Sequence, residues 1–231
     1  MKTGIMGGTF DPIHNGHLML GQAAYESFDL DQVWFMPNGN PPHKKSSSME
    51  SEVEDRIRMT ELAIRPFPQF KIELYEAERT KISYSYSTME YLTKAHPGDA
   101  FYFILGADSL FTIESWRYPE RFFRTCTVLA TYRDDINTVE KMNTQIRYLR
   151  EKYDARIELF ATSPVKVSSH ELREEVKEGR CIASYVPAEV ETYISEHHLY
   201  QDRSCILLRK WVFNRTLKEE KKWTIRLQRY V

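Results

Sequence analysis

The amino-acid sequence predicts an α/β fold in which helices cover both faces of one parallel sheet. Short apolar runs alternate with longer amphipathic stretches, which is the pattern of strands connected by helices. The 231 residues suit one sizeable domain with a real core. The composition, 42% hydrophobic and 28% charged, is that of an ordinary globular protein.

The periodicity of apolar residues places the individual elements. Short apolar runs predict strands over residues 3–6, 33–36, 71–74, 101–105, 127–131 and 156–160. Helical spacing predicts helices over residues 18–27, 52–64, 88–95, 139–152 and 171–177.

Two segments interrupt this alternation. Residues 37–48, PNGNPPHKKSSS, follow a strand and predict an exposed loop at its carboxyl end, the edge where open α/β sheets bind ligands. Residues 202–231 carry nine basic and three acidic side chains. We therefore expect one domain over residues 1–200, followed by a basic C-terminal extension over 201–231 whose role the sequence leaves open.

Bulk properties exclude several classes of protein. The formal net charge of −1 argues against a broad nucleic-acid surface, so we expect no nucleic-acid partner. No run approaches the roughly 18 apolar residues of a membrane span, and the N-terminus does not fit a signal peptide. Cys126, Cys181 and Cys205 are far apart and form no CxxC pair, which favours the cytoplasm and disfavours structural zinc. These properties are compatible with either a monomer or a homo-oligomer.

Two histidines follow the glycine-rich end of the first predicted strand, in GIMGGTFDPIHNGHLML. Gly8 and the glycine before it allow a tight turn and close approach to a ligand. With a helix beginning near Asn15, His14 and His17 project from the same side of its first turn. The free amides and positive dipole end of that turn bind phosphate well. The sequence therefore predicts a phosphate site here.

Other interpretations of the histidines are weaker. A single histidine is more often a structural capping or packing residue. A metal site needs a third ligand at a fixed place, and the sequence shows none, so no metal site is predicted. Two common phosphate-binding motifs, the GxGxxG fingerprint and the GxxxxGK[ST] loop, are both absent from the sequence. The predicted phosphate site is therefore of a different type.

Four ordered motifs resemble the HxGH nucleotidyltransferase superfamily, and in their long form the bacterial nicotinate-nucleotide adenylyltransferases. They lie at residues 7–17 (GGTFDPIHNGH), 37–44 (PNGNPPHK), 105–116 (LGADSL followed by SW) and 167–200. The resemblance covers about residues 1–200 and implies a Rossmann-like fold. Three positions depart from the family pattern. His170 follows the paired serines where threonine is usual, and in SYSYST (residues 83–88) Ser85 and Ser87 replace a threonine and an aspartate.

The resemblance implies a reaction in which the phosphate of nicotinate mononucleotide attacks the α-phosphorus of ATP. Its products are nicotinate adenine dinucleotide and pyrophosphate. Because the nucleophile is already an anion, catalysis can rest on holding two polyanions in line and stabilising the developing charge. Mg²⁺ is expected on the ATP phosphates, since it keeps most of its waters and the sequence shows no dedicated acidic cluster.

The resemblance also implies the site residues. His14, His17 and Arg173 are the expected catalytic residues, with His17 as the transition-state contact. The expected ATP-binding residues are Gly8, Thr9, Phe10, His14, His17, Lys44, Gly106, Asp108, Ser168, Ser169 and Arg173. The expected residues for nicotinate mononucleotide are Asn40, Lys44, Ser85, Trp116 and Arg133.

Residue chemistry agrees with these roles. The serines and Arg173 begin a second helix and form a second anion site. Asp108 follows a strand and a glycine, where a carboxylate accepts from ribose hydroxyls, although it could instead cap a helix beginning near Ser109. Trp116 offers a flat face on which the nicotinate ring can stack. The alternative is that its side chain packs in the hydrophobic core.

Two other classes of function stay open at this level. One is another HxGH transferase, acting on phosphopantetheine, nicotinamide mononucleotide or glycerol phosphate. The other is a regulatory nucleotide- or RNA-binding protein that uses the basic extension as its contact.

Overall fold

The computed structural model describes residues 1–39, 49–132, 139–162 and 167–201. Three predicted binding residues, Asn40, Lys44 and Arg133, lie outside these ranges, as does the basic extension from residue 202 onward.

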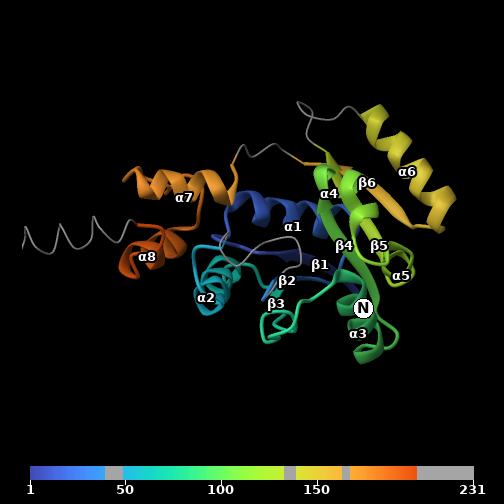
Figure 1. The fold of residues 1–231 in the computed structure, drawn as a ribbon, viewed down its shortest axis with the longest axis horizontal. Helices are drawn as coiled ribbons and strands as arrows, with labels where there is room; N and C mark the ends of the chain where they lie inside the picture. The colour runs from blue at the N-terminus through green and yellow to red at the C-terminus, as the bar shows by residue number, and fades with distance from the viewer. Residues whose placement is uncertain (40–48, 133–138, 163–166, 202–231) are drawn as a thin grey trace, which may run out of the picture.

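The described chain forms an all-parallel sheet of six strands in the order β3-β2-β1-β4-β5-β6 (Figure 1). The strands are β1 (Lys2–Gly8), β2 (Gln32–Pro37), β3 (Phe70–Ile72), β4 (Ala100–Gly106), β5 (Thr127–Tyr132) and β6 (Ile157–Ala161). All six predicted strands are confirmed, with small shifts at their ends.

Helices connect the strands and continue after the last one. They are α1 (Asn15–Ser27), α2 (Val53–Ile64), α3 (Ser85–Ala95), α4 (Ala107–Thr112), the 3₁₀ helix η2 (Ile113–Ser115), α5 (Pro119–Phe123), α6 (Val139–Tyr153), α7 (Ser169–Lys177) and α8 (Ala188–Glu196). The five predicted helices are confirmed. The helices α5 and α8 were not predicted, and α4 was considered only as a possible helix beginning near Ser109, because apolar periodicity is weak evidence in segments of fewer than three turns.

Two hydrophobic cores lie on opposite faces of the sheet. One packs Leu18 of α1, Met59 of α2, Leu172 of α7 and Val190 of α8 against one face. The other packs Met89 of α3, Leu110 of α4, Phe122 of α5 and Ile146 of α6 against the opposite face. Neighbouring strand residues divide between the two cores, as alternation along a strand requires. The prediction of helices on both faces is confirmed.

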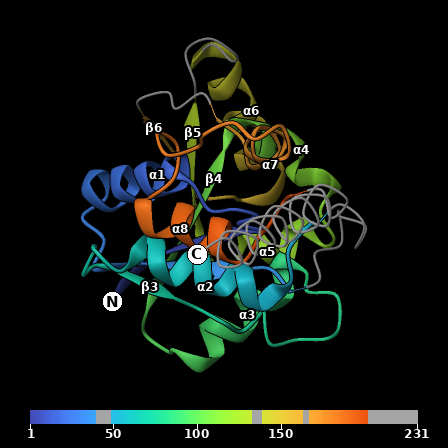
Figure 2. The same ribbon diagram turned by 90° about the vertical axis from the view of Figure 1, so that its left-hand side faces the viewer.

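The C-terminal helices complete the first face. α8 lies beside α2 (Figure 2), where Arg65 pairs with Glu189 at 2.7 Å and the Tyr193 hydroxyl donates to Asp55 at 2.9 Å. α7 and α8 thereby occupy the end of the molecule away from α6 (Figure 1).

Strand order also places the ligand-binding edge. The chain builds outward from β1 in one direction through β2 and β3, and in the other through β4, β5 and β6. In open α/β sheets the crevice beyond the carboxyl ends of the strands at such a reversal binds ligands. Here that crevice lies between the β1–α1 loop and the start of α4.

Candidate active site

The loop between β1 and α1 is tied to the body of the protein through a buried carboxylate. Asp11, which is 1% exposed, accepts hydrogen bonds from the backbone N–H of Glu50 (2.9 Å), from the hydroxyl of Ser51 (2.5 Å) and from the hydroxyl of Tyr200 (2.7 Å). Burial, with the nearby Asp11 charge, raises the pKa of Tyr200, so its hydroxyl stays protonated as a donor. The Asp11–Pro12 peptide bond is cis. Two segments far apart in sequence, one with Glu50 and Ser51 and the other with Tyr200, therefore fix this loop.

A buried guanidinium joins the ends of β1 and β2. Arg56, 1% exposed, donates from Nη1 to the carbonyl oxygens of Thr9 (2.8 Å) and Asn38 (2.6 Å). Burial lowers the pKa of Arg56, and the charge of Asp11 opposes that shift. Sequence reasoning missed Asp11, Arg56 and Tyr200, because a polar residue in an amphipathic segment carries no local sign that it will be buried.

The histidine pair has the predicted geometry. α1 begins at Asn15 with His14 as its N-cap, and the two imidazole rings stack with centroids 3.7 Å apart. Nδ1 of His17 accepts from the backbone N–H of His14 at 3.2 Å, and the ring of Phe10 meets His17 edge-on at 5.1 Å. The first turn of α1 contains no acidic side chain. The positive end of α1 thus keeps the character of an anion site.

The start of α7 lies against the same loop. The hydroxyl of Ser169 donates to the carbonyl oxygen of Pro12 at 2.9 Å, and Nη1 of Arg173 donates to the carbonyl oxygen of Asp11 at 2.8 Å. The structure therefore brings Ser168, Ser169 and Arg173 to the loop that carries His14 and His17. We call this region, the starts of α1 and α7, the helix-start end of the site.

The two helix starts differ in one respect that the sequence reasoning did not anticipate. Ser168 caps α7 in a capping box, in which Glu171 accepts from the Ser168 backbone and hydroxyl, both at 2.9 Å. Nε of Arg173 donates to Glu50 at 3.0 Å, and Arg173 is 7% exposed. The donors of α7 are thus paired with carboxylates of the chain itself, one of them in its own first turn, whereas the first turn of α1 contains no acidic residue. Phosphate binding by Arg173 and both serines stays a prediction.

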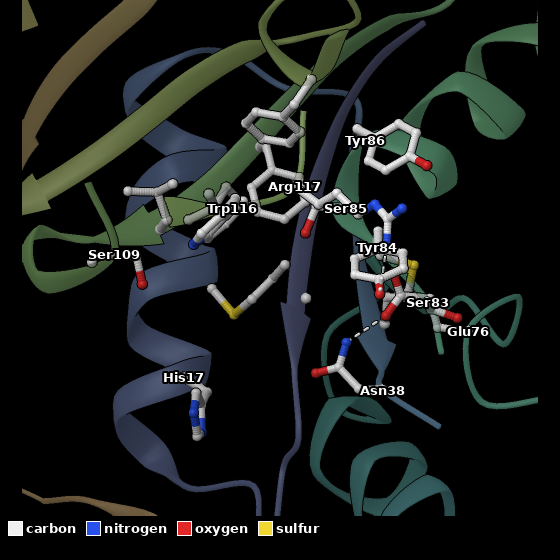
Figure 3. A pocket seen from close by; sticks show the side chains of 18 of the residues that line it. His17, Asn38, Glu76, Ser83, Tyr84, Ser85, Tyr86, Ser109, Trp116 and Arg117 are labelled. Atoms are coloured by element: carbon white, nitrogen blue, oxygen red, sulfur yellow. Dashed lines mark hydrogen bonds between the residues drawn. The ribbon is translucent and has the colours of Figure 1, made fainter. Parts of the chain in front are cut away.

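A cavity of about 300 Å³ opens beside this end, between the carboxyl ends of β1 and β4 and the start of α3 (Figure 3). His17 lines it on one side, and Tyr84, Ser85, Trp116 and Arg117 line it on the other. We call these last four residues the aromatic end. The cavity is the crevice that the strand order indicates.

Trp116 both lines the cavity and contacts the core. Its half-buried indole packs edge-on against Phe122 (centroids 5.4 Å apart) and Phe103 (6.1 Å). Trp116 can therefore pack in the core and also be available to a ligand ring, because it lines the cavity while Phe122 and Phe103 hold it. Ser85 is the first residue of α3 and faces the same cavity.

A buried acid also lines the cavity and was not predicted. Glu76, 3% exposed, accepts from the side-chain amide of Asn38 and from the hydroxyl of Thr88, the latter at 2.7 Å. Burial raises the pKa of Glu76, although both hydrogen bonds oppose the shift. Glu76 therefore orients the Asn38 amide at the edge of the cavity.

The remaining predicted nucleotide contacts lie at the ends of β1 and β4. Gly106 ends β4 and is the N-cap of α4, and Asp108 is exposed in the first turn of that helix. The alternative role of Asp108 as an N-cap is wrong, because α4 begins earlier, at Ala107. A Cβ on Gly8 would come within 2.6 Å of the Phe10 ring. Since Phe10 is 2% exposed, its backbone rather than its ring is left for a ligand.

No group of three or more His, Cys, Asp or Glu side chains within the described ranges has a metal-binding arrangement. None of the helices in those ranges is long and apolar enough to cross a membrane.

Fold and site together define the class of protein. The six-stranded parallel sheet, the histidine pair at a helix start and the adjoining cavity are those of a nucleotidyltransferase, and the cytidylyltransferase-like family model matches residues 5–175. Relatives narrow the class. A probable nicotinate-nucleotide adenylyltransferase of Lachnoclostridium phytofermentans is 43% identical, over 86% of this chain and 98% of its own. The chain therefore belongs to the nicotinate-nucleotide adenylyltransferase family.

Further similarities agree with that family. A probable nicotinate-nucleotide adenylyltransferase of Geobacillus kaustophilus is 36% identical over 97% of this chain and 98% of its own, so its alignment extends past residue 201. Among solved structures, the Plasmodium falciparum nicotinic acid mononucleotide adenylyltransferase complexed with NaAD has a TM-score of 0.70 and 22% identity, covering 87% of this chain and 98% of that one. This likeness confirms the Rossmann-like α/β fold.

Proposed function

We propose that the protein transfers the adenylyl group of ATP to nicotinate mononucleotide, giving nicotinate adenine dinucleotide and pyrophosphate. The observation that carries this proposal is one continuous site, in which a helix start with two stacked histidines adjoins a cavity walled by Trp116 and Ser85. The first part suits phosphates and the second suits a flat aromatic ring.

The proposed chemistry requires positioning rather than proton abstraction. A phosphate oxygen of nicotinate mononucleotide forms a bond to the α-phosphorus of ATP, and the bond from that phosphorus to the bridging oxygen of pyrophosphate breaks. We assign His17 to the transferring phosphate and His14 to the neighbouring ATP phosphates, at the positive end of α1. Arg173, Ser168 and Ser169 are assigned to the ATP phosphates from the α7 side.

The other assignments follow the same division. Gly8, Thr9, Phe10, Gly106 and Asp108 are assigned to ATP from the ends of β1 and β4, with the Asp108 carboxylate accepting from ribose hydroxyls. Trp116 stacks on the nicotinate ring and Ser85 donates to its carboxylate. Asn40 and Lys44 are assigned to nicotinate mononucleotide, and Lys44 also to ATP, on the motif resemblance alone. Arg133 is assigned to the mononucleotide phosphate because it follows a predicted strand.

We propose that Mg²⁺ enters with ATP. The described residues offer no carboxylate cluster for a protein-bound ion, whereas the phosphates of ATP supply the oxygen ligands that Mg²⁺ prefers. When bound there, it would neutralise phosphate charge.

The cytoplasm is the compartment we propose. Cys126 and Cys181 are free thiols, and burial raises the pKa of Cys126 to about 12, which keeps it an unreactive core residue. Isolated free cysteines support a reducing compartment.

An acceptor panel tests the proposed function. The protein is incubated with ATP or CTP and, in turn, with nicotinate mononucleotide, nicotinamide mononucleotide, phosphopantetheine or glycerol phosphate, and pyrophosphate release is measured. We expect the fastest turnover with ATP and nicotinate mononucleotide. Turnover no faster with the acid than with the amide would contradict the acid-specific assignment. A His17→Ala preparation purified in parallel controls for contaminating activity.

A further inference from the structure

The aromatic end of the cavity carries a guanidinium that the proposed function has not used. Arg117 follows Trp116 directly and lines the cavity beside Tyr84 and Ser85, on the side away from His17 (Figure 3). Among the described residues that line the cavity, it is the one lysine or arginine. A positive charge therefore stands at the end of the cavity farther from the phosphate-binding helix start.

Neighbouring rings hold this guanidinium in place. Nη1 of Arg117 donates to the hydroxyl of Tyr84 at 3.2 Å, and its Cζ lies 5.0 Å from the centre of the Tyr84 ring and 5.4 Å from that of Tyr118. The hydrogen bond to Tyr84 uses one of the five N–H donors of an arginine. The group is thus oriented and still able to bind a second acceptor.

The acid at the cavity does not cancel this charge. Glu76 is buried, and its carboxylate already accepts from the Asn38 amide and the Thr88 hydroxyl in the wall of the cavity. Arg117, in contrast, is exposed, and its hydrogen bond to Tyr84 raises its pKa. The aromatic end therefore favours an anionic group.

If the proposed function holds, the two ends of the acceptor match the two ends of the site. Nicotinate mononucleotide has a phosphate at one end and a ring carboxylate at the other, whereas its amide counterpart has only the phosphate. With the phosphate toward His17 and the ring on Trp116, the ring substituent lies toward Ser85 and Arg117. We propose that Arg117 is a specificity residue that recognises the ring carboxylate and selects the acid over the amide.

The test compares Arg117→Gln with a matched variant, Arg121→Gln. Arg121 is also an arginine over tyrosine rings, 4.5 Å from the centre of Tyr86, but it is paired with Glu90 at 2.6 Å and does not line the cavity. For Arg117→Gln we expect kcat/KM for nicotinate mononucleotide to fall about tenfold and that for nicotinamide mononucleotide to change less than about twofold, because only the acid loses a charge-assisted hydrogen bond. Arg117→Lys should be intermediate.

Each outcome separates this inference from the proposed function. An unchanged acid-to-amide ratio in Arg117→Gln, or an equal fall with both acceptors, would overturn the role of Arg117 while leaving the function intact. A wild-type protein that does not prefer the acid would overturn both. Calorimetric titration with nicotinate mononucleotide alone gives a second measurement, with a Kd about tenfold weaker expected in Arg117→Gln.

Discussion

At the helix-start end of the site, two of the groups assigned to phosphate are buried, whereas at the aromatic end the groups assigned to the acceptor ring are more exposed. His14 is 6% exposed and Arg173 7%, and the loop between them is fixed through Asp11. Trp116 is half-buried and Arg117 is exposed, held by rings rather than by buried carboxylates. A site that joins two polyanions must hold the transferred phosphorus rigidly, whereas the surface that binds the acceptor ring must be accessible from solvent.

This difference has consequences for substitutions. Changes at the helix-start end should alter kcat and stability together, because the same groups position phosphate and hold the chain. Changes at the aromatic end should alter mainly the KM of the acceptor.

His17→Ala should lower kcat about 100- to 1,000-fold, as does the loss of one preorganised donor to a developing charge. The KM for ATP should change less than about threefold, because the contact strengthens in the transition state. Steady-state kinetics measure both, with circular dichroism to confirm folding. His170→Ala removes an exposed histidine at the start of α7 and is the control. An unchanged kcat would remove His17 from the proposed role.

Arg173→Ala should lower the free energy of unfolding by about 3 kcal/mol, because it leaves Glu50 and the Asp11 carbonyl without their buried partner. Urea denaturation measures the change. The matched control is Arg58→Ala, which breaks an exposed pair with Glu61 and should cost about 0.5 kcal/mol or less. Equal losses in the two variants would show that Arg173 does not brace the helix-start end.

Trp116→Ala should raise the KM for nicotinate mononucleotide about tenfold, since stacking of a base on an aromatic side chain contributes about 1–3 kcal/mol. The KM for ATP should stay within about twofold. Trp116→Phe keeps a ring against Phe122 and should recover part of the loss. A rise in the KM for ATP alone would contradict the assignment of Trp116 to nicotinate mononucleotide.

Glu76→Gln should change how stability depends on pH, which is the smallest expected effect. Burial raises the pKa of Glu76 above its ordinary value of 4.5, so the folded protein binds that proton more tightly than the unfolded chain. Stability from this group is therefore present at low pH and lost as pH rises from about 4.5 through the folded pKa.

Urea denaturation at several pH values measures that dependence. The free energy of unfolding of the wild type, minus that of Glu76→Gln, should fall as pH rises. Glu78→Gln, at an exposed position two residues on, should show no such trend. A difference that grows with pH would mean that the hydrogen bonds from Asn38 and Thr88 outweigh burial.

Local patterns predicted much of the fold. All six strands and five of the helices follow from runs and periodicities within about a dozen residues. The short helix α5 did not, and α4 was considered only through a possible start near Ser109, because these helices depend on packing Leu110 and Phe122 into the core rather than on a pattern of their own.

The candidate site divides in the same way. The glycine-rich turn, the histidine pair and the serines before Arg173 are local signals, and they predicted two helix starts at one sheet edge. The partners of those groups were not predictable, since Asp11 meets Tyr200 and Arg173 meets Glu50 across 189 and 123 positions. Nor did any pattern indicate that Glu76 would be buried beside the cavity or that Arg117 would face it.

Local sequence features specify the α/β alternation, the position of His14 and His17 at the start of α1, and the motifs that resemble the family. Helix caps and apolar periodicities depend on residues within a turn or two of chain, so they can be recognised in the sequence. The pairing of the α7 donors with Glu50 and Glu171, and the guanidinium at the far end of the acceptor cavity, are apparent in the folded protein alone. Those pairings depend on which distant segments pack together, and packing is settled by the whole fold.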